Sequence, residues 1–104
     1  MRVVIRLDGV NQRRYGPAWI ALVTGWPIGK SPELRFGGQI NHNVAEIDAP
    51  AGAIVKFGRT DHRGRETQNG FGYVLPNGEI QPLGNVKARE LWLADHSKKE
   101  DDAA

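Results

Sequence analysis

Short runs in which apolar and polar residues alternate, separated by turns rich in glycine and proline, make up most of the chain. In the first of these runs, Val3, Ile5 and Leu7 fall on one face of an extended segment. Successive side chains of a β-strand point to opposite faces, so a period of two indicates a strand with one buried face. A chain patterned in this way folds by packing or closing antiparallel sheets around a core.

The same reasoning predicts further strands along the chain. Residues 18–23 are apolar throughout, which is typical of a central strand covered on both faces. Asn77-Gly78 is a strong hairpin signal, so Ile80 is expected to pair back onto the strand before it. We therefore predict a mainly β fold, a small antiparallel β-barrel or sandwich of about six or seven short strands. The predicted strands span residues 2–8, 18–23, 33–36, 44–48, 53–57 and 71–75, and the strand at Ile80 follows them.

One C-terminal segment has a helical pattern. Asn85 is a suitable N-cap, and the residues that follow it are mostly good helix formers. Ala88 and Leu91 recur at helical spacing and give this segment an apolar face. We predict one α-helix over about 85–96, packed across an open end or face of the β-structure, and a disordered charged tail at 97–104.

Length and composition exclude several classes of protein. The 104 residues, 39% of them hydrophobic, suit one globular domain, which we expect over residues 1–96. No apolar run approaches the roughly 18 residues of a membrane span, and the N-terminus lacks a signal-peptide pattern, which favours a cytoplasmic protein without a membrane partner. The chain has no cysteine, which excludes disulfides, thiolate nucleophiles and Cys-ligated zinc.

Charge is distributed unevenly along the chain. The formal net charge is +2, yet residues 1–30 contain five Lys or Arg against one Asp, and residues 51–70 contain four against two acidic residues. Positive potential is therefore expected on the N-terminal segment and on the central polar segment. The sequence pI of about 9.2 permits an anionic partner without requiring one.

The polar segment 58–70, predicted as one long loop, holds the densest cationic cluster. Loops of this length inside a compact domain are usually functional or disordered. Arginine presents a planar fork of donors that matches phosphate, and it also stacks on bases. Arg13, Arg14 and Tyr15 form a second candidate group, because an aromatic ring beside arginines offers a further stacking face.

These residues predict a non-catalytic binding module that recognises an anionic partner, above all nucleic acid, through arginine-rich loops. The alternative is a small protein-binding module or inhibitor of bacterial or phage type. It would use Trp26 and the Arg59–Arg65 loop as interface anchors, since Trp and Arg are enriched at binding hot spots. The sequence leaves the partner's identity and the oligomeric state open. The candidate partner-binding residues are Arg13, Arg14, Tyr15, Trp26, Arg59, His62, Arg63 and Arg65.

Three other motifs have simpler explanations. Residues 25–31 resemble a phosphate-binding loop, but three residues rather than four separate the glycines and a proline follows, so we predict a turn. His42, His62 and His96 lack the spacing of metal ligands. Asp61 beside His62 suits a carboxylate that accepts backbone hydrogen bonds in a turn better than an acid–base pair. We predict no catalytic residue, metal or cofactor.

Overall fold

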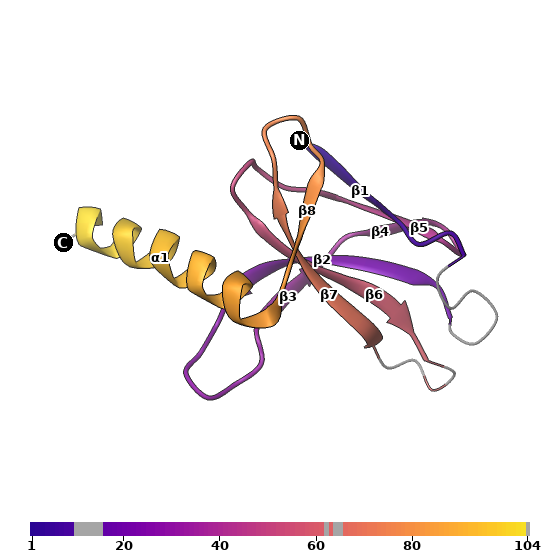
Figure 1. The fold of residues 1–104 in the computed structure, drawn as a ribbon, viewed down its shortest axis with the longest axis horizontal. Helices are drawn as coiled ribbons and strands as arrows, with labels where there is room; N and C mark the ends of the chain where they lie inside the picture. Colours follow the sequence, from indigo (N-terminus) through magenta and orange to yellow (C-terminus); the bar gives the residue numbers. More distant parts are fainter. Residues whose placement is uncertain (10–15, 62, 64–65, 104) are drawn as a thin grey trace.

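The computed structural model describes residues 1–9, 16–61, 63 and 66–103. In these residues, eight strands form two antiparallel sheets, and one helix follows them (Figure 1). The mainly β prediction is confirmed, as a sandwich-like pair of sheets and not as a closed barrel. The elements are β1 (Arg2–Arg6), β2 (Ala18–Gly25), β3 (Glu33–Phe36), β4 (Gly38–Asn41), β5 (Val44–Asp48), β6 (Ile54–Thr60), β7 (Glu66–Val74), β8 (Ile80–Leu83) and α1 (Asn85–Ala103).

The chain passes from the larger sheet to the smaller one at Gly37-Gly38. The smaller sheet has the order β1-β5-β4, and the larger has the order β3-β2-β6-β7-β8. Gly37 lies between β3 of the larger sheet and β4 of the smaller one, and its N–H donates to the carbonyl oxygen of Ile20 at 2.8 Å. A Cβ at Gly37 would collide with the backbone carbonyl of Glu46. The crossing therefore needs a residue without a side chain.

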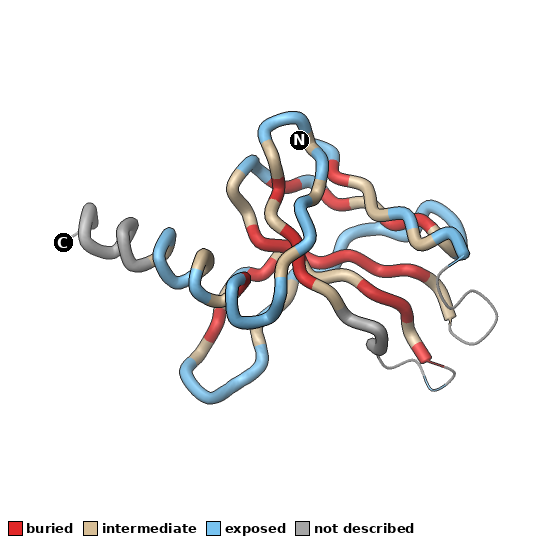
Figure 2. Tube along the Cα trace, viewed as in Figure 1, coloured by how far each residue is buried: buried red, intermediate tan, exposed pale blue. Residues whose placement is uncertain are grey.

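The core lies between the two sheets and is drawn in red in Figure 2. As predicted, β2 is a central strand, paired with β3 on one side and β6 on the other, and most of its residues are buried. Alternate residues of β1, β2, β5 and β6 point into this core, as the period-two pattern requires. The buried members are Val3, Ala18, Ile20, Ala45, Ile47, Ala49, Val55 and Val74.

Helix α1 packs on the outer face of the larger sheet. Ala88 is fully buried there in a second apolar cluster that includes Val23, Ile54 and Phe71. The helix was predicted to end near His96, but it continues to Ala103, and its C-terminal turns extend away from the sheets (Figure 1). The extension has a local cause, because no glycine or proline follows the helix start to interrupt it.

Several strand boundaries differ from the prediction, and one strand was not predicted. The segment 58–70 is not one long loop, because β6 continues to Thr60 and β7 begins at Glu66. The polar residues at these strand ends broke the apolar alternation on which the prediction depended. Strand β4 was missed for a similar reason, since all four of its residues are exposed and give no buried face to detect.

In the part of the chain that the structure describes, no helix combines the length and the apolar character needed to cross a membrane.

Candidate nucleic-acid interface

Arg59 was predicted in an exposed loop, and that prediction is wrong. It lies in β6, on the same face of the strand as Val55 and Phe57, and is fully buried at one end of the core. Its guanidinium donates to the carbonyl oxygens of Leu7 at 2.7 Å and His42 at 3.0 Å. Arg59 is therefore a structural residue that closes this end of the sandwich.

The hydrogen bonds of Arg59 connect segments that are far apart in the sequence. Besides the two carbonyls above, the guanidinium donates to the carbonyl of Gly16 at 3.2 Å and to Oδ1 of Asn43 at 2.5 Å. Its acceptors thus lie after β1, before β2 and in the β4–β5 turn. A planar fork with five N–H donors can serve several acceptors at once. One side chain therefore links three segments that backbone hydrogen bonds also join at this end of the sandwich.

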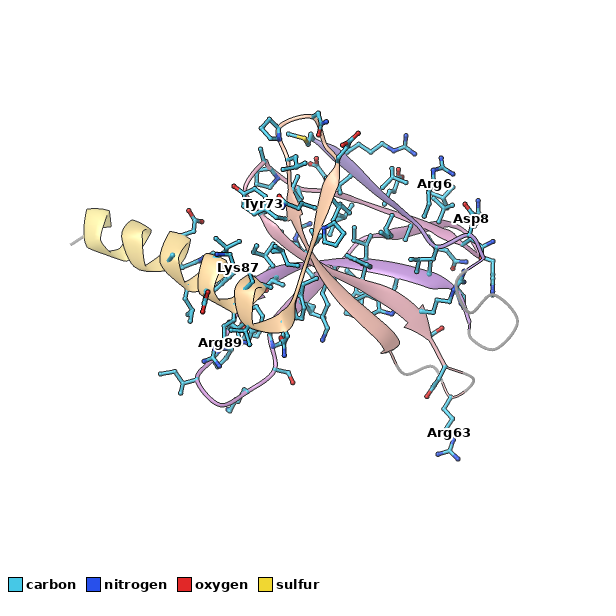
Figure 3. The ribbon with its side chains drawn as sticks, viewed as in Figure 1. Arg6, Asp8, Arg63, Tyr73, Lys87 and Arg89 are labelled. Atoms are coloured by element: carbon cyan, nitrogen blue, oxygen red, sulfur yellow. The ribbon has the colours of Figure 1, made fainter. Side chains whose placement is uncertain are left out.

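The hairpin connection between β6 and β7 starts from this fixed end. Asp61 is buried, and its Oδ1 accepts a hydrogen bond from the backbone N–H of Arg63 at 2.8 Å. The prediction that Asp61 acts as a turn carboxylate is confirmed. The side chain of Arg63 is exposed and points away from both sheets (Figure 3). Among the predicted arginines, Arg63 is thus presented to solvent by a hydrogen-bonded turn.

Gly16, which follows the second predicted basic segment, lies at the same end of the molecule. The N–H of Gly16 donates to the carbonyl of Thr60 at 2.6 Å, and the N–H of Thr60 donates to the carbonyl of Pro17 at 3.2 Å. Arg6 lies on this side too, whereas Lys87 lies in the first turn of α1, away from the β6–β7 hairpin (Figure 3). The remaining predicted binding residues lie outside the described residues: Arg13, Arg14, Tyr15, His62 and Arg65.

Trp26 is part of the core. It is 8% exposed, and its ring stacks on that of Phe71 with centroids 5.3 Å apart. It lies in the turn between β2 and β3, where the N–H of Lys30 donates to the carbonyl of Pro27 at 3.2 Å, so the predicted turn at residues 25–31 is confirmed. Trp26 therefore caps the cluster under α1, and the structure does not bring it together with Arg63.

Two residues that the sequence did not single out lie together on the outer face of the larger sheet. Ala21 of β2 pairs with Phe36 of β3 on one side and with Lys56 of β6 on the other. Phe36 is 50% exposed and contacts the ring of Trp19 with centroids 5.6 Å apart. The alternation of apolar and polar residues assigns each side chain to a face of its own strand. The order of the strands in the sheet is what places Phe36 and Lys56 on either side of Ala21.

The nitrogen and carboxylate side chains of the described residues form no group that would hold a metal ion. The ring of His96 stacks on Trp92, with centroids 3.6 Å apart, and its Nδ1 lies 2.8 Å from the carbonyl oxygen of the same tryptophan. His42 is exposed and contributes its carbonyl oxygen to the Arg59 network. These two histidines are accounted for by surface and packing contacts.

The candidate site in the described residues thus consists of the exposed Arg63 on a hydrogen-bonded hairpin, and of Phe36 and Lys56 on the outer face of the same sheet. Comparison of the chain with known protein families, with curated proteins and with solved structures finds no match.

Proposed function

We propose that the chain is a non-catalytic module that binds nucleic acid through the end of the sandwich where β6 and β7 turn. The observation that carries this proposal is the exposed Arg63, held on a turn that Asp61 stabilises from a buried position. Phosphate contacts of Lys and Arg supply most of the affinity for nucleic acid, because they release condensed counterions. An arginine whose backbone is already positioned loses less freedom on binding.

The neighbouring charges also support an anionic partner. Arg6 is exposed at the end of β1, on the same side of the molecule as Arg63 (Figure 3). The carboxylate of Asp61 is buried and bonded to the turn, so it is not presented to a ligand. The exposed Asp8 lies beside Arg6 in Figure 3, so among the described residues the positive charge of this end rests mainly on Arg63.

The test compares two matched cation-to-amide variants. Arg63→Gln is expected to weaken binding to oligonucleotides of every sequence and to flatten the dependence of log affinity on log salt, by up to about 0.9 per lost duplex-phosphate contact. Lys87→Gln removes an exposed cation from α1, away from the β6–β7 hairpin, and should leave both quantities unchanged. Fluorescence anisotropy with labelled oligonucleotides over a salt series measures the slope.

Equal effects of the two variants would show that general charge, and not this hairpin, drives binding. Absence of binding by the parent protein at about 50 mM salt, where the electrostatic contribution is strong, would overturn the proposal. Both variants change exposed side chains, so the free energy of unfolding of each should stay within about 0.5 kcal/mol of the parent value.

One observation favours a protein-binding module as the second candidate. Ile28 is 93% exposed in the turn that carries Trp26, and the exposed Val86 and Leu93 border a cavity of about 320 Å³ whose wall includes Trp26. Exposed apolar side chains around a groove are typical of protein interfaces. This groove replaces Trp26 and Arg59 as the anchors, because both of those side chains are buried. Loss of a protein partner on Leu93→Lys, together with no affinity for nucleic acid, would favour this candidate.

A further inference from the structure

We propose that the nucleic acid is bound as a single strand whose unpaired bases stack on the outer face of the larger sheet, beside Phe36. This inference rests on the proposed function and specifies the form of nucleic acid that the site accepts. Bases in a duplex are stacked on one another and present only their edges in the grooves. An exposed aromatic ring on a sheet selects unpaired bases, because their faces are accessible.

The strand register places an aromatic ring and a cation in one row across three strands. Phe36, Ala21 and Lys56 are successive partners in β3, β2 and β6, and their side chains point to the outer face. Neighbouring strands are about 4.8 Å apart, so Phe36 and Lys56 are separated by about 10 Å. Ala21 between them is small and fully buried. The ammonium of Lys56 lies over the ring of Phe71 of β7, 5.4 Å from its centroid, so the row presents the stacking surface of Phe36 at one side and this cation beyond β6 at the other.

The ring of Phe36 contacts a buried ring, and the side chain is 50% exposed. It contacts the buried Trp19 at 5.6 Å between centroids, with the two planes tilted by 57°. Trp19 in turn pairs with Gly58 of β6, which contributes no side chain to this part of the face. A supported ring keeps its orientation before a base arrives, which reduces the entropy cost of stacking.

Helix α1 covers a different part of the same face. It packs over the end that includes Val23 and Ile54, where Ala88 and Trp92 contact the sheet. The indole N–H of Trp92 donates to the carbonyl oxygen of Val23 at 3.2 Å and fixes the helix there. In the described chain the helix contacts β6 and β7. Phe36 itself remains 50% exposed.

The face is continuous with the proposed phosphate-binding end. Strand β6 carries Lys56 and runs on to Thr60, after which the hairpin presents Arg63. With a rise of about 3.3 Å per residue, the five residues from Lys56 to Asp61 span about 17 Å. A single strand lying along β6 would place bases beside Phe36 and phosphates toward Lys56 and Arg63. Proteins that bind single strands likewise combine aromatic side chains that stack on bases with cationic side chains that contact the phosphates.

The test measures binding of a labelled oligo-dT of about 12 nucleotides and of a duplex of equal length by fluorescence anisotropy. The parent is expected to bind the single strand more tightly. Phe36→Ala should weaken single-strand binding by about 5- to 150-fold, the loss expected for one stacked base, and should leave duplex binding unchanged. Phe36→Trp should retain the single-strand affinity. Ile40→Ala, which truncates a similarly exposed side chain on β4 of the other sheet, should change neither.

Phe36→Leu separates stacking from folding, because leucine keeps an apolar contact with Trp19 but offers no aromatic face. Single-strand affinity should fall in this variant while its melting temperature stays close to that of the parent. Equal affinity for both forms, or no effect of Phe36→Leu, would overturn this inference and leave the proposed function standing. No binding to either form by the parent would overturn the proposed function itself.

Discussion

Replacing Arg59 with alanine is expected to lower the free energy of unfolding by about 3–5 kcal/mol, a large share of the roughly 5–15 kcal/mol that stabilises a domain. The guanidinium is fully buried and donates to the carbonyl oxygens of Leu7, Gly16 and His42. Without it, the carbonyls of Leu7 and Gly16 lose this donor, whereas that of His42 still accepts from the N–H of Ala18 at 2.8 Å. A buried polar group left unsatisfied costs about 1–3 kcal/mol. Urea unfolding followed by circular dichroism measures the loss.

Two further variants distinguish this explanation from a general effect of charge. Arg59→Lys keeps the charge but replaces the planar fork by one ammonium, so it should recover only part of the stability. Arg63→Ala removes an exposed arginine of the same hairpin and should change stability by less than about 0.5 kcal/mol. A cost below about 1 kcal/mol for Arg59→Ala would contradict the assigned structural role.

Gly37→Ala is expected to destabilise the fold by about 1–3 kcal/mol, while Gly38→Ala should cost almost nothing. An ideal Cβ at Gly37 would collide with the backbone carbonyl of Glu46 and lie 2.8 Å from Cβ of Ile47. Those atoms belong to β5 and cannot move without displacing the strand. A Cβ at Gly38 would meet no heavy atom within 4 Å. Thermal unfolding of the two variants makes the comparison.

The adjacent glycine is a close control, because both substitutions have the same chemistry and the same effect on the unfolded chain. Equal melting temperatures for the two variants would mean that the sheets do not approach each other at Gly37 as described. A larger loss for Gly38→Ala would place the crossing between the sheets at the wrong residue.

The sequence predicted the strands wherever apolar alternation was strong. Strands β1, β3 and β5 and the Asn77-Gly78 hairpin all follow from period two and turn chemistry. Strand β4 and the ends of β6 and β7 were missed, because their residues are polar or exposed. Pairing across the sheet stabilises such segments, and a single sequence does not reveal its pairing partners.

The functional residues show the same limit more sharply. Arg59 looked like its neighbour Arg63 in the sequence, yet one is buried and the other exposed. The difference depends on carbonyl groups brought together from distant segments, which local patterns do not encode. Phe36 and Lys56 gave no signal either, since they become neighbours only through the register of β2 with β3 and β6. Residue type identified suitable donors, and strand order decided which of them are exposed.

Amide chemical-shift mapping identifies the residues that a bound single strand contacts. Nitrogen-15-labelled protein is titrated with a short single-stranded oligonucleotide at about 50 mM salt, where phosphate contacts are strong. We predict shift changes at Arg63, around Phe36 and along β6 near Lys56, with α1 unaffected. No change at any amide, or changes confined to α1 and the groove beside Trp26, would contradict the account.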